Sequence, residues 1–347
     1  MSTASPTTVL AAASAWQREL AHAITSPGEL ATALGLPAAS LDGAADASTR
    51  FALRVPRGFV ARMRPGDPRD PLLLQVLPLA QELAPVAGYG ADPLQELGQM
   101  QPPGLLQKYR GRALLVASGA CAINCRYCFR REFPYAEASV TPGTLAPVLQ
   151  ALAADAGIEE VILSGGDPLA LSDQRLATLL GAIGRMPQVK RIRIHTRLPV
   201  VLPERVDAGL LGALGQASQP LVVVLHANHA NELDASVARA AADLAGAGAT
   251  LLNQSVLLRG INDEAGTLAA LSQRLFELGV LPYYLHLLDP VRGAAHFRVG
   301  ERRARRILGA VAALLPGYLV PRLARERPGA PAKEILAPTL HNRRQVT

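Results

Sequence analysis

The sequence predicts an α/β protein whose core is an open or partial (β/α)6 barrel. Two observations carry this prediction. Six short β-rich runs follow one another along the chain, and alanine- and leucine-rich stretches long enough for helices separate them. The runs are continuously apolar, as expected of parallel strands that helices cover on the outer face. They span residues 113–117, 161–163, 189–195, 221–226, 250–257 and 283–287.

Two segments flank the barrel, which we place at residues 106–325. Residues 1–105 are expected to be helical and irregular. Apolar residues have helical spacing over residues 16–24 and 29–34, and Ser26-Pro27 between these two stretches ends the first helix and caps the second. The many prolines from Pro56 to Pro103 indicate turns. Residues 326–347 form a short C-terminal segment. Since α/β barrels run past about 200 residues as single units, 347 residues with 49% hydrophobic content are compatible with this plan.

Composition limits the classes of partner. The net charge is +7, but the basic residues are spread along the chain, and the one dense knot, Arg302–Arg306, is best explained as a solvated helix face. Only 4% of residues are aromatic, which leaves few surfaces on which bases could stack, so we expect no direct nucleic-acid binding. No apolar run reaches the roughly 20 residues that span a membrane, and Met1–Pro6 do not resemble a secretory signal. We expect the reducing cytoplasm.

All three cysteines of the chain lie in one C-x3-C-x2-C run, at Cys121, Cys125 and Cys128. An odd count cannot form a disulfide framework, and no further Cys or His follows at the spacing of a zinc site. Three thiolates can hold a [4Fe–4S] cluster and leave one iron open to a small molecule, whereas ordinary clusters take four. This run resembles the signature of the radical S-adenosylmethionine (SAM) enzymes.

Polar residues follow the predicted strands, as in barrels whose reactive groups gather at the carboxyl ends of the strands. The segment Ser164-Gly165-Gly166-Asp167 follows the second strand, and the glycine pair permits close approach of a ligand to the backbone. By itself the segment could be an ordinary turn, but after the cysteine loop it resembles the SAM-binding Gly-Gly-Glu segment of radical SAM enzymes. The later strands contribute His195, His226, His229, Gln254 and Asp289. We expect the histidines to be packed in the barrel rather than catalytic.

Lysine is scarce, because only Lys108, Lys190 and Lys333 occur among 35 basic residues. Where charge alone is needed, this chain uses arginine, so a lysine weakly indicates amine chemistry. Lys333 lies in the Pro/Gly-rich run Pro328–Lys333 and is a candidate Schiff-base residue, although an exposed tail lysine is the alternative.

Over residues 105 to 336 the chain resembles the lysine 2,3-aminomutase family of radical SAM enzymes. The motifs that carry the resemblance are Tyr109–Arg112, the cysteine loop with Arg130-Arg131, Ser164–Leu169, Thr196–Pro203, Asn253–Asp263, His296–Arg298, Gly317–Pro321 and the Lys333 segment. The resemblance implies a [4Fe–4S] cluster on the cysteines, SAM, and pyridoxal 5′-phosphate (PLP) on Lys333 with its phosphate near Arg112. It also implies SAM contacts at Ser164, Gly165, Gly166, Asp167 and Gln254.

The resemblance further implies L-lysine as substrate. Arg130 would face the α-carboxylate, and Asp289 and Glu326 would take the ε-ammonium. A simple ion pair with Arg322 or Arg325 is the alternative use of Glu326. The opening of the chain, its C-terminal length and Glu326 itself are most similar to the branch that supplies (R)-β-lysine for β-lysylation of elongation factor P. A partner ligase and a reductant protein such as a flavodoxin or ferredoxin would then be involved.

Three alternatives stay open. The chain could be a free-lysine 2,3-aminomutase of lysine metabolism, or an aminomutase of another amino acid such as glutamate. The acidic pair Asp289 and Glu326 argues against an acidic substrate. A cluster-carrying protein that binds RNA or ribosomes through its arginines is the third alternative, and it would show salt-sensitive RNA retention without SAM cleavage.

Overall fold

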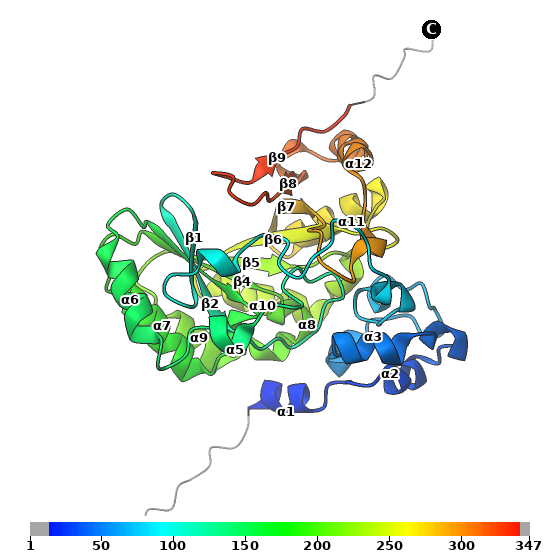
Figure 1. Cartoon of the computed structure of the whole chain (residues 1–347), viewed down its shortest axis with the longest axis horizontal. Helices are drawn as coiled ribbons and strands as arrows, with labels where there is room; N and C mark the ends of the chain where they lie inside the picture. Colours follow the sequence, from blue (N-terminus) through cyan, green and yellow to red (C-terminus); the bar gives the residue numbers. More distant parts are fainter. Residues whose placement is uncertain (1–13, 341–347) are drawn as a thin grey trace, which may run out of the picture.

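The computed structural model describes residues 14–340, and the expected absence of a secretory signal at Met1–Pro6 concerns residues outside that range. One nine-stranded sheet runs through the molecule, with its strands paired in sequence order from β1 to β9 (Figure 1). The strands are β1 Leu105–Tyr109, β2 Arg112–Ser118, β3 Glu160–Gly165, β4 Arg191–Thr196, β5 Leu221–His226, β6 Thr250–Leu257, β7 Leu281–Leu287, β8 Arg322–Arg325 and β9 Glu334–Ile335.

The six predicted strands correspond to β2–β7, and these six are parallel to one another. Three strands were missed. β1 pairs antiparallel with β2, β8 adds a further parallel strand beside β7, and β9 returns antiparallel along β8. β8 and β9 are short, and β8 carries an arginine at each end. Neither of these two strands shows the long apolar run that marks an internal strand.

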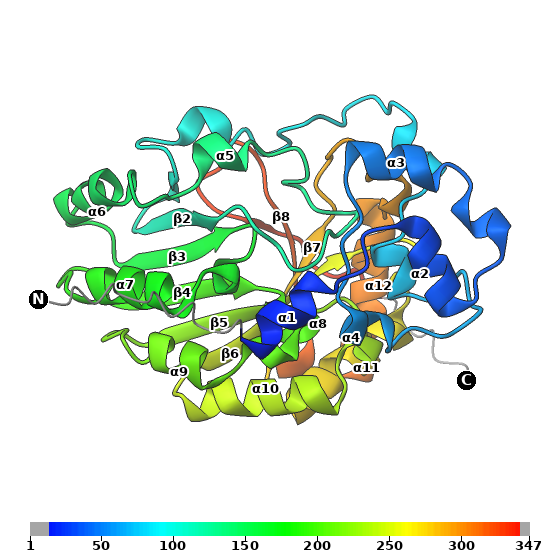
Figure 2. The same ribbon diagram turned by 90° about the horizontal axis from the view of Figure 1, so that it is seen from below.

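Helices between the strands cover the outer face of the sheet. Figure 2 shows α6, α7, α9 and α10 side by side along that face. The barrel helices are α5 Tyr135–Ala138, α6 Leu145–Ala154, α7 Asp173–Gly184, α8 Leu198–Val201, α9 Ala208–Leu214, α10 Ala235–Gly246, α11 Ala265–Glu277 and α12 Glu301–Leu314. Side chains of Ser172, Asp207 and Asp234 accept hydrogen bonds from the first turns of α7, α9 and α10, which fixes where these helices begin.

The N-terminal region consists of short helices joined by proline-rich turns. They are α1 Ala15–Ala21, α2 Pro27–Leu34, α3 Ala44–Arg50 and α4 Arg57–Val60, with 3-10 turns η1 Ala38–Leu41, η2 Leu73–Gln75, η3 Ala80–Leu83 and η4 Leu97–Gln99. Ser26 caps α2, and Pro27 is its first residue, as the sequence predicted. Further 3-10 turns in the barrel are η5 Pro168–Ala170, η6 Pro203–Arg205, η7 Ala230–Glu232, η8 Ala295–Phe297 and η9 Gly317–Leu319.

One hydrophobic core joins the N-terminal helices to the barrel. Trp16, Leu30 and Phe59 belong to the same buried cluster as Leu163 of β3 and Val223 of β5. The basic knot lies in α12, where Arg302, Arg303 and Arg306 are exposed, so the expectation of a solvated helix face is confirmed. Among the described residues, none of the helices combines the length and apolar character needed to cross a membrane.

Candidate active site

A cavity of about 390 Å³ opens at the carboxyl ends of the parallel strands, within the usual size range of small-molecule sites. Every residue that the sequence analysis proposed for the site lines this cavity. These are Cys121, Cys125, Cys128, Arg112, Arg130, Ser164, Gly165, Gly166, Asp167, Gln254, Asp289, Glu326 and Lys333. They come from segments 221 positions apart at the extremes, because parallel strands deliver their following loops to one edge.

The loop after β2 brings the three cysteines to the cavity wall. All three thiols are free and half-buried, and burial raises the pKa of Cys128 to about 11. No three His, Cys, Asp or Glu side chains of the described chain converge on one metal-ion position. A [4Fe–4S] cluster does not require such convergence, because its irons sit at separate corners. A thiol-only donor set with no fourth cysteine in the chain fits a cluster with one open iron.

The glycine pair after β3 is required by contacts within the chain. Gly165 has φ +117°, and a Cβ there would lie 2.5 Å from the Ser118 carbonyl oxygen; at Gly166 it would lie 2.6 Å from that of Ala120. The two glycines thus let the β3 loop pack directly on the cysteine loop. This reason is independent of the ligand approach that the sequence suggested.

Asp167 lines the cavity, but the chain itself occupies both of its carboxylate oxygens. Oδ1 accepts hydrogen bonds from the Leu169 amide and the Thr196 hydroxyl, and Oδ2 accepts from the amides of Arg197 and Leu198. This carboxylate therefore pins the loop after β4 to the loop after β3.

Arg130 is buried and held by Glu96, a residue that the sequence analysis did not single out. Its Nε and Nη2 donate to the two oxygens of Glu96 at 2.7 and 2.9 Å. Burial would raise the pKa of Glu96, but the charges of Arg130 and Lys108 outweigh it and hold that pKa at about 2. The remaining nitrogen, Nη1, makes only longer contacts, at 3.3 Å to Ser164 Oγ and 3.4 Å to the Gly165 carbonyl.

Lys333 and Glu326 face each other across the β8–β9 hairpin and form an ion pair. The alternative pairing of Glu326 with Arg322 or Arg325 is not found; Arg325 instead binds Glu301 and Glu334. Burial lowers the pKa of Lys333 to about 7, and the charge of nearby Asp289 opposes that shift. Burial likewise raises the pKa of Asp289 to about 6, against the opposing charges of Lys333 and Lys108.

Lys108 is the second residue that the sequence analysis left unassigned. Its Nζ lies 2.6 Å from Glu96 Oε1 and 3.3 Å from Glu326 Oε2. The scarcity of lysine in the chain was a signal that could have found it. Glu96 had no such signal, since it lies in a proline-rich stretch without periodicity.

Arg112 of β2 and Gln254 of β6 also line the cavity. The Arg112 guanidinium lies 5.1 Å from the centre of the Tyr109 ring. Three histidines also line the cavity: His195, His226 and His286. Burial holds the pKa of each below its ordinary value, so they are neutral, and Nε2 of His195 is buried without a hydrogen-bond partner.

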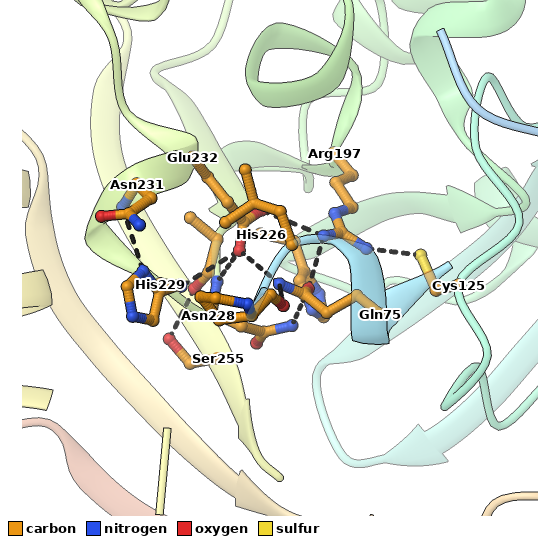
Figure 3. Close-up of polar contacts among 12 residues, drawn as sticks. Gln75, Cys125, Arg197, His226, Asn228, His229, Asn231, Glu232 and Ser255 are labelled. Atoms are coloured by element: carbon orange, nitrogen blue, oxygen red, sulfur yellow. Dashed lines mark hydrogen bonds and ion pairs between the residues drawn. The ribbon is translucent and has the colours of Figure 1, made fainter. Parts of the chain in front are cut away.

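A buried polar network ties the cysteine loop to the N-terminal region (Figure 3). Arg197 Nη1 lies 2.6 Å from Cys125 Sγ, and its Nη2 donates to Gln75 of η2 and to Glu232 of η7. The amide of Asn228 donates to Glu232, and the Asn228 side chain donates to Gln75 and to the Tyr127 hydroxyl. The thiol loop is thereby held by three segments that are distant in sequence.

The chain is similar to known proteins over most of its length. The family described as the radical SAM superfamily matches residues 115–266 in sequence. The chain is 48% identical over 319 residues to the L-lysine 2,3-aminomutase of Escherichia coli strain K12, covering 92% of this chain and 93% of that protein. It is 45% identical to the L-lysine 2,3-aminomutase of Haemophilus influenzae, covering 93% and 95%. Against the L-lysine 2,3-aminomutase of Clostridium subterminale the identity is 32%, covering 93% and 78%.

Proposed function

The chain belongs to the L-lysine 2,3-aminomutase family of radical SAM enzymes, which are isomerases, and from that premise we propose that it converts (S)-α-lysine to (R)-β-lysine. The proposal includes three cofactors: a [4Fe–4S] cluster, SAM and PLP. The observation that carries it is one cavity lined by the three thiols of the radical SAM loop, by a lysine of lowered pKa and by charged groups of both signs.

The donor groups at one side of the cavity suit the cluster and SAM. Cys121, Cys125 and Cys128 would hold the cluster, and the backbone at Ser164–Gly166 with Gln254 would hold SAM beside it. We assign Asp167 the role of positioning the loop after β4, because its carboxylate oxygens already accept hydrogen bonds from that loop. When bound, the cluster and SAM supply a radical able to remove hydrogen from the unactivated β-carbon of lysine, and PLP carries the nitrogen that migrates.

The charged groups suit the two ends of lysine. Nη1 of Arg130 is available for the α-carboxylate, since the other donors of its fork bind Glu96. Asp289 and Glu326, which line the same cavity, supply negative charge for the ε-ammonium. Two carboxylates around one desolvated ammonium favour a cationic side chain over a neutral or acidic one, which supports lysine over glutamate.

Lys333 is proposed to bind PLP. An amine must be neutral to attack a carbonyl, and a pKa of about 7 leaves a substantial neutral fraction at neutral pH. Arg112, at the same cavity, would face the phosphate. The buried and half-buried residues that line the cavity would keep water away from the reacting atoms.

A substrate panel tests the activity. Cluster-reconstituted protein with SAM, PLP and a reductant is incubated anaerobically with L-lysine, L-glutamate or L-norleucine in separate reactions. We expect an isomer of equal mass to form from lysine alone. Isomer formation from glutamate, or SAM cleavage with no isomer from lysine, would refute the proposed substrate.

Peptide mapping tests the PLP assignment separately. Borohydride fixes PLP to the amine that carries it, and we expect the label on Lys333. The variant Lys333→Ala should lose the visible absorbance of bound PLP while it keeps the absorbance of the cluster. A label on Lys108 or Lys190 would move the cofactor elsewhere.

The product is proposed to serve β-lysylation of elongation factor P, with a ligase that attaches it and a flavodoxin or ferredoxin as reductant. Glu326 supports this branch, because the resemblance to it rests in part on that acid. Intact-mass measurement of elongation factor P from cells with and without this enzyme tests it. An unchanged mass would favour free-lysine metabolism.

A further inference from the structure

An alternating chain of charges runs across the cavity. It leads from Arg130 through Glu96, Lys108 and Glu326 to Lys333, with Arg130–Glu96, Glu96–Lys108 and Lys108–Glu326 contacts of 2.7, 2.6 and 3.3 Å. All five residues line the cavity. Side-chain exposure is 2% for Glu96 and 17% for Lys108, so these ion pairs are shielded from solvent rather than lying on a surface.

Glu96 and Lys108, which we call the inner residues of this chain, play no part in the proposed reaction. Their neighbours do: Arg130 is assigned to the substrate carboxylate and Glu326 to its ε-ammonium. Glu96 therefore offers Arg130 a carboxylate, and Lys108 offers Glu326 an ammonium. The pair presents to the site the same two charged groups that lysine presents.

Each inner residue leaves one atom of its neighbour for a ligand. Glu96 takes Nε and Nη2 of Arg130 and leaves Nη1 with its two longer contacts. Lys108 takes Oε2 of Glu326 and leaves Oε1, which here binds Lys333. Glu96 thus determines that Nη1 of Arg130 is left for a carboxylate, and Lys108 determines that Oε1 of Glu326 is left for an ammonium. Glu96 and Lys108 in turn form an ion pair with each other.

We propose that Lys108, held by Glu96, is a specificity-determining residue that restricts the site to ligands with a carboxylate at one end and an ammonium at the other. The inference rests on the proposed function, because that function assigns Arg130 and Glu326 to the two ends of lysine. The Lys108 ammonium contacts one of the two carboxylate oxygens of Glu326. Its positive charge therefore disfavours the binding of a dication that has no carboxylate. The same charge supports binding of a carboxylate near Arg130.

Two half-ligands separate these effects. Norleucine has the carboxylate and lacks the ε-ammonium, whereas 1,5-diaminopentane has both ammoniums and lacks the carboxylate. Their Kd values are measured by calorimetry on the cluster- and PLP-loaded protein with SAM, without turnover. Lys108→Gln should weaken the binding of norleucine and strengthen the binding of 1,5-diaminopentane, because it removes a positive charge within a few ångströms of the site. The Kd of norleucine divided by the Kd of 1,5-diaminopentane should therefore rise at least about tenfold. Lys108→Arg should restore most of the ratio.

Lys190→Gln is the matched control, because Lys190 is exposed and its side chain donates to the Pro187 carbonyl rather than to a residue of the cavity. It should leave both Kd values unchanged. An unchanged ratio in Lys108→Gln, or weakening of both half-ligands by the same factor, would overturn the inference in favour of a purely structural Lys108. Binding of neither half-ligand by the unaltered protein would overturn it as well. Failure of the proposed function is read separately, from turnover of lysine by the unaltered protein.

Discussion

The amine of Lys333 is a group whose acidity the site changes strongly. Its pKa is lowered from 10.5 to about 7 by burial, and Asp289 opposes the shift. We predict that the rate of PLP uptake by the PLP-free protein rises with pH around a midpoint near 7, because only the neutral amine reacts. Asp289→Asn removes the opposing charge and should move the midpoint to lower pH. Stopped-flow absorbance across pH measures both, and a midpoint near 10 would contradict the account.

The same shift has a defined sign for stability. The unfolded chain binds a proton at Lys333 up to its ordinary pKa of 10.5, whereas the folded chain releases it near 7. Between these values the unfolded state binds more protons, so the contribution of Lys333 makes folding more favourable as pH rises from 7 to 10. Lys333→Met should remove this dependence from the free energy of unfolding of the PLP-free protein.

At the residue scale, the sequence predicted the members of the site but not their partners. The cysteine spacing and the Lys333 segment are local signals, so they could be read without coordinates. Glu96 and Lys108 take their meaning from each other and from Arg130, and no spacing along the chain encodes that contact. The engagement of Asp167 by the β4 loop was likewise out of reach, because it depends on how two loops meet.

The β3 loop is predicted to tolerate no side chain at Gly165. Gly165→Ala would place a Cβ 2.5 Å from the Ser118 carbonyl oxygen in a left-handed conformation, at a cost of at least about 1–3 kcal/mol of unfolding free energy. Gly212→Ala is the matched control, since Gly212 is exposed on α9 with open space around it, and it should stabilise by up to about 1 kcal/mol. Denaturant unfolding compares them, and equal effects would contradict the assignment.

The network around η7 is predicted to be the main polar support of the cysteine loop. Glu232→Gln removes the charge that faces buried Arg197 and should lower the free energy of unfolding by about 3–5 kcal/mol. Glu277→Gln breaks an exposed pair with Arg274 and should cost less than about 1 kcal/mol. Chemical denaturation of the cluster-free proteins measures the difference, and a similar small loss in both would show that the network is not needed.

At the scale of elements, continuous apolar runs predicted the inner strands β2–β7 well. They did not reveal β1, β8 and β9, which are short, carry polar residues and pair only at the sheet margins. The β8–β9 hairpin matters for the proposed function, because it sets Glu326 opposite Lys333. The sequence singled out Glu326 and Lys333 as candidate site residues, but the Pro/Gly-rich run between them gave no sign of a hairpin.

The shared core makes a prediction for the whole molecule. Trp16 is the one tryptophan of the chain and is buried with the barrel core, so its fluorescence reports the N-terminal region. We predict that denaturant unfolding followed by this fluorescence coincides with unfolding followed by circular dichroism of the barrel. Leu30→Ala, at a fully buried position, should shift both curves together by about 2–5 kcal/mol.

Leu314→Ala is the control for that experiment, because Leu314 is 59% exposed on α12 and should change stability by less than about 0.5 kcal/mol. Two separated transitions in the unaltered protein would mean that the N-terminal region folds as an independent unit. The coincident result would mean that the N-terminal helices and the barrel unfold as one cooperative unit.

The most direct test of the whole account is the product itself. Cluster-reconstituted protein is incubated anaerobically with PLP, SAM, a reductant and L-lysine, and α-lysine is resolved from the two forms of β-lysine by chiral chromatography. The account predicts (R)-β-lysine, formed only when all three cofactors are present. Absence of β-lysine from protein that retains its cluster and PLP and still cleaves SAM would contradict it.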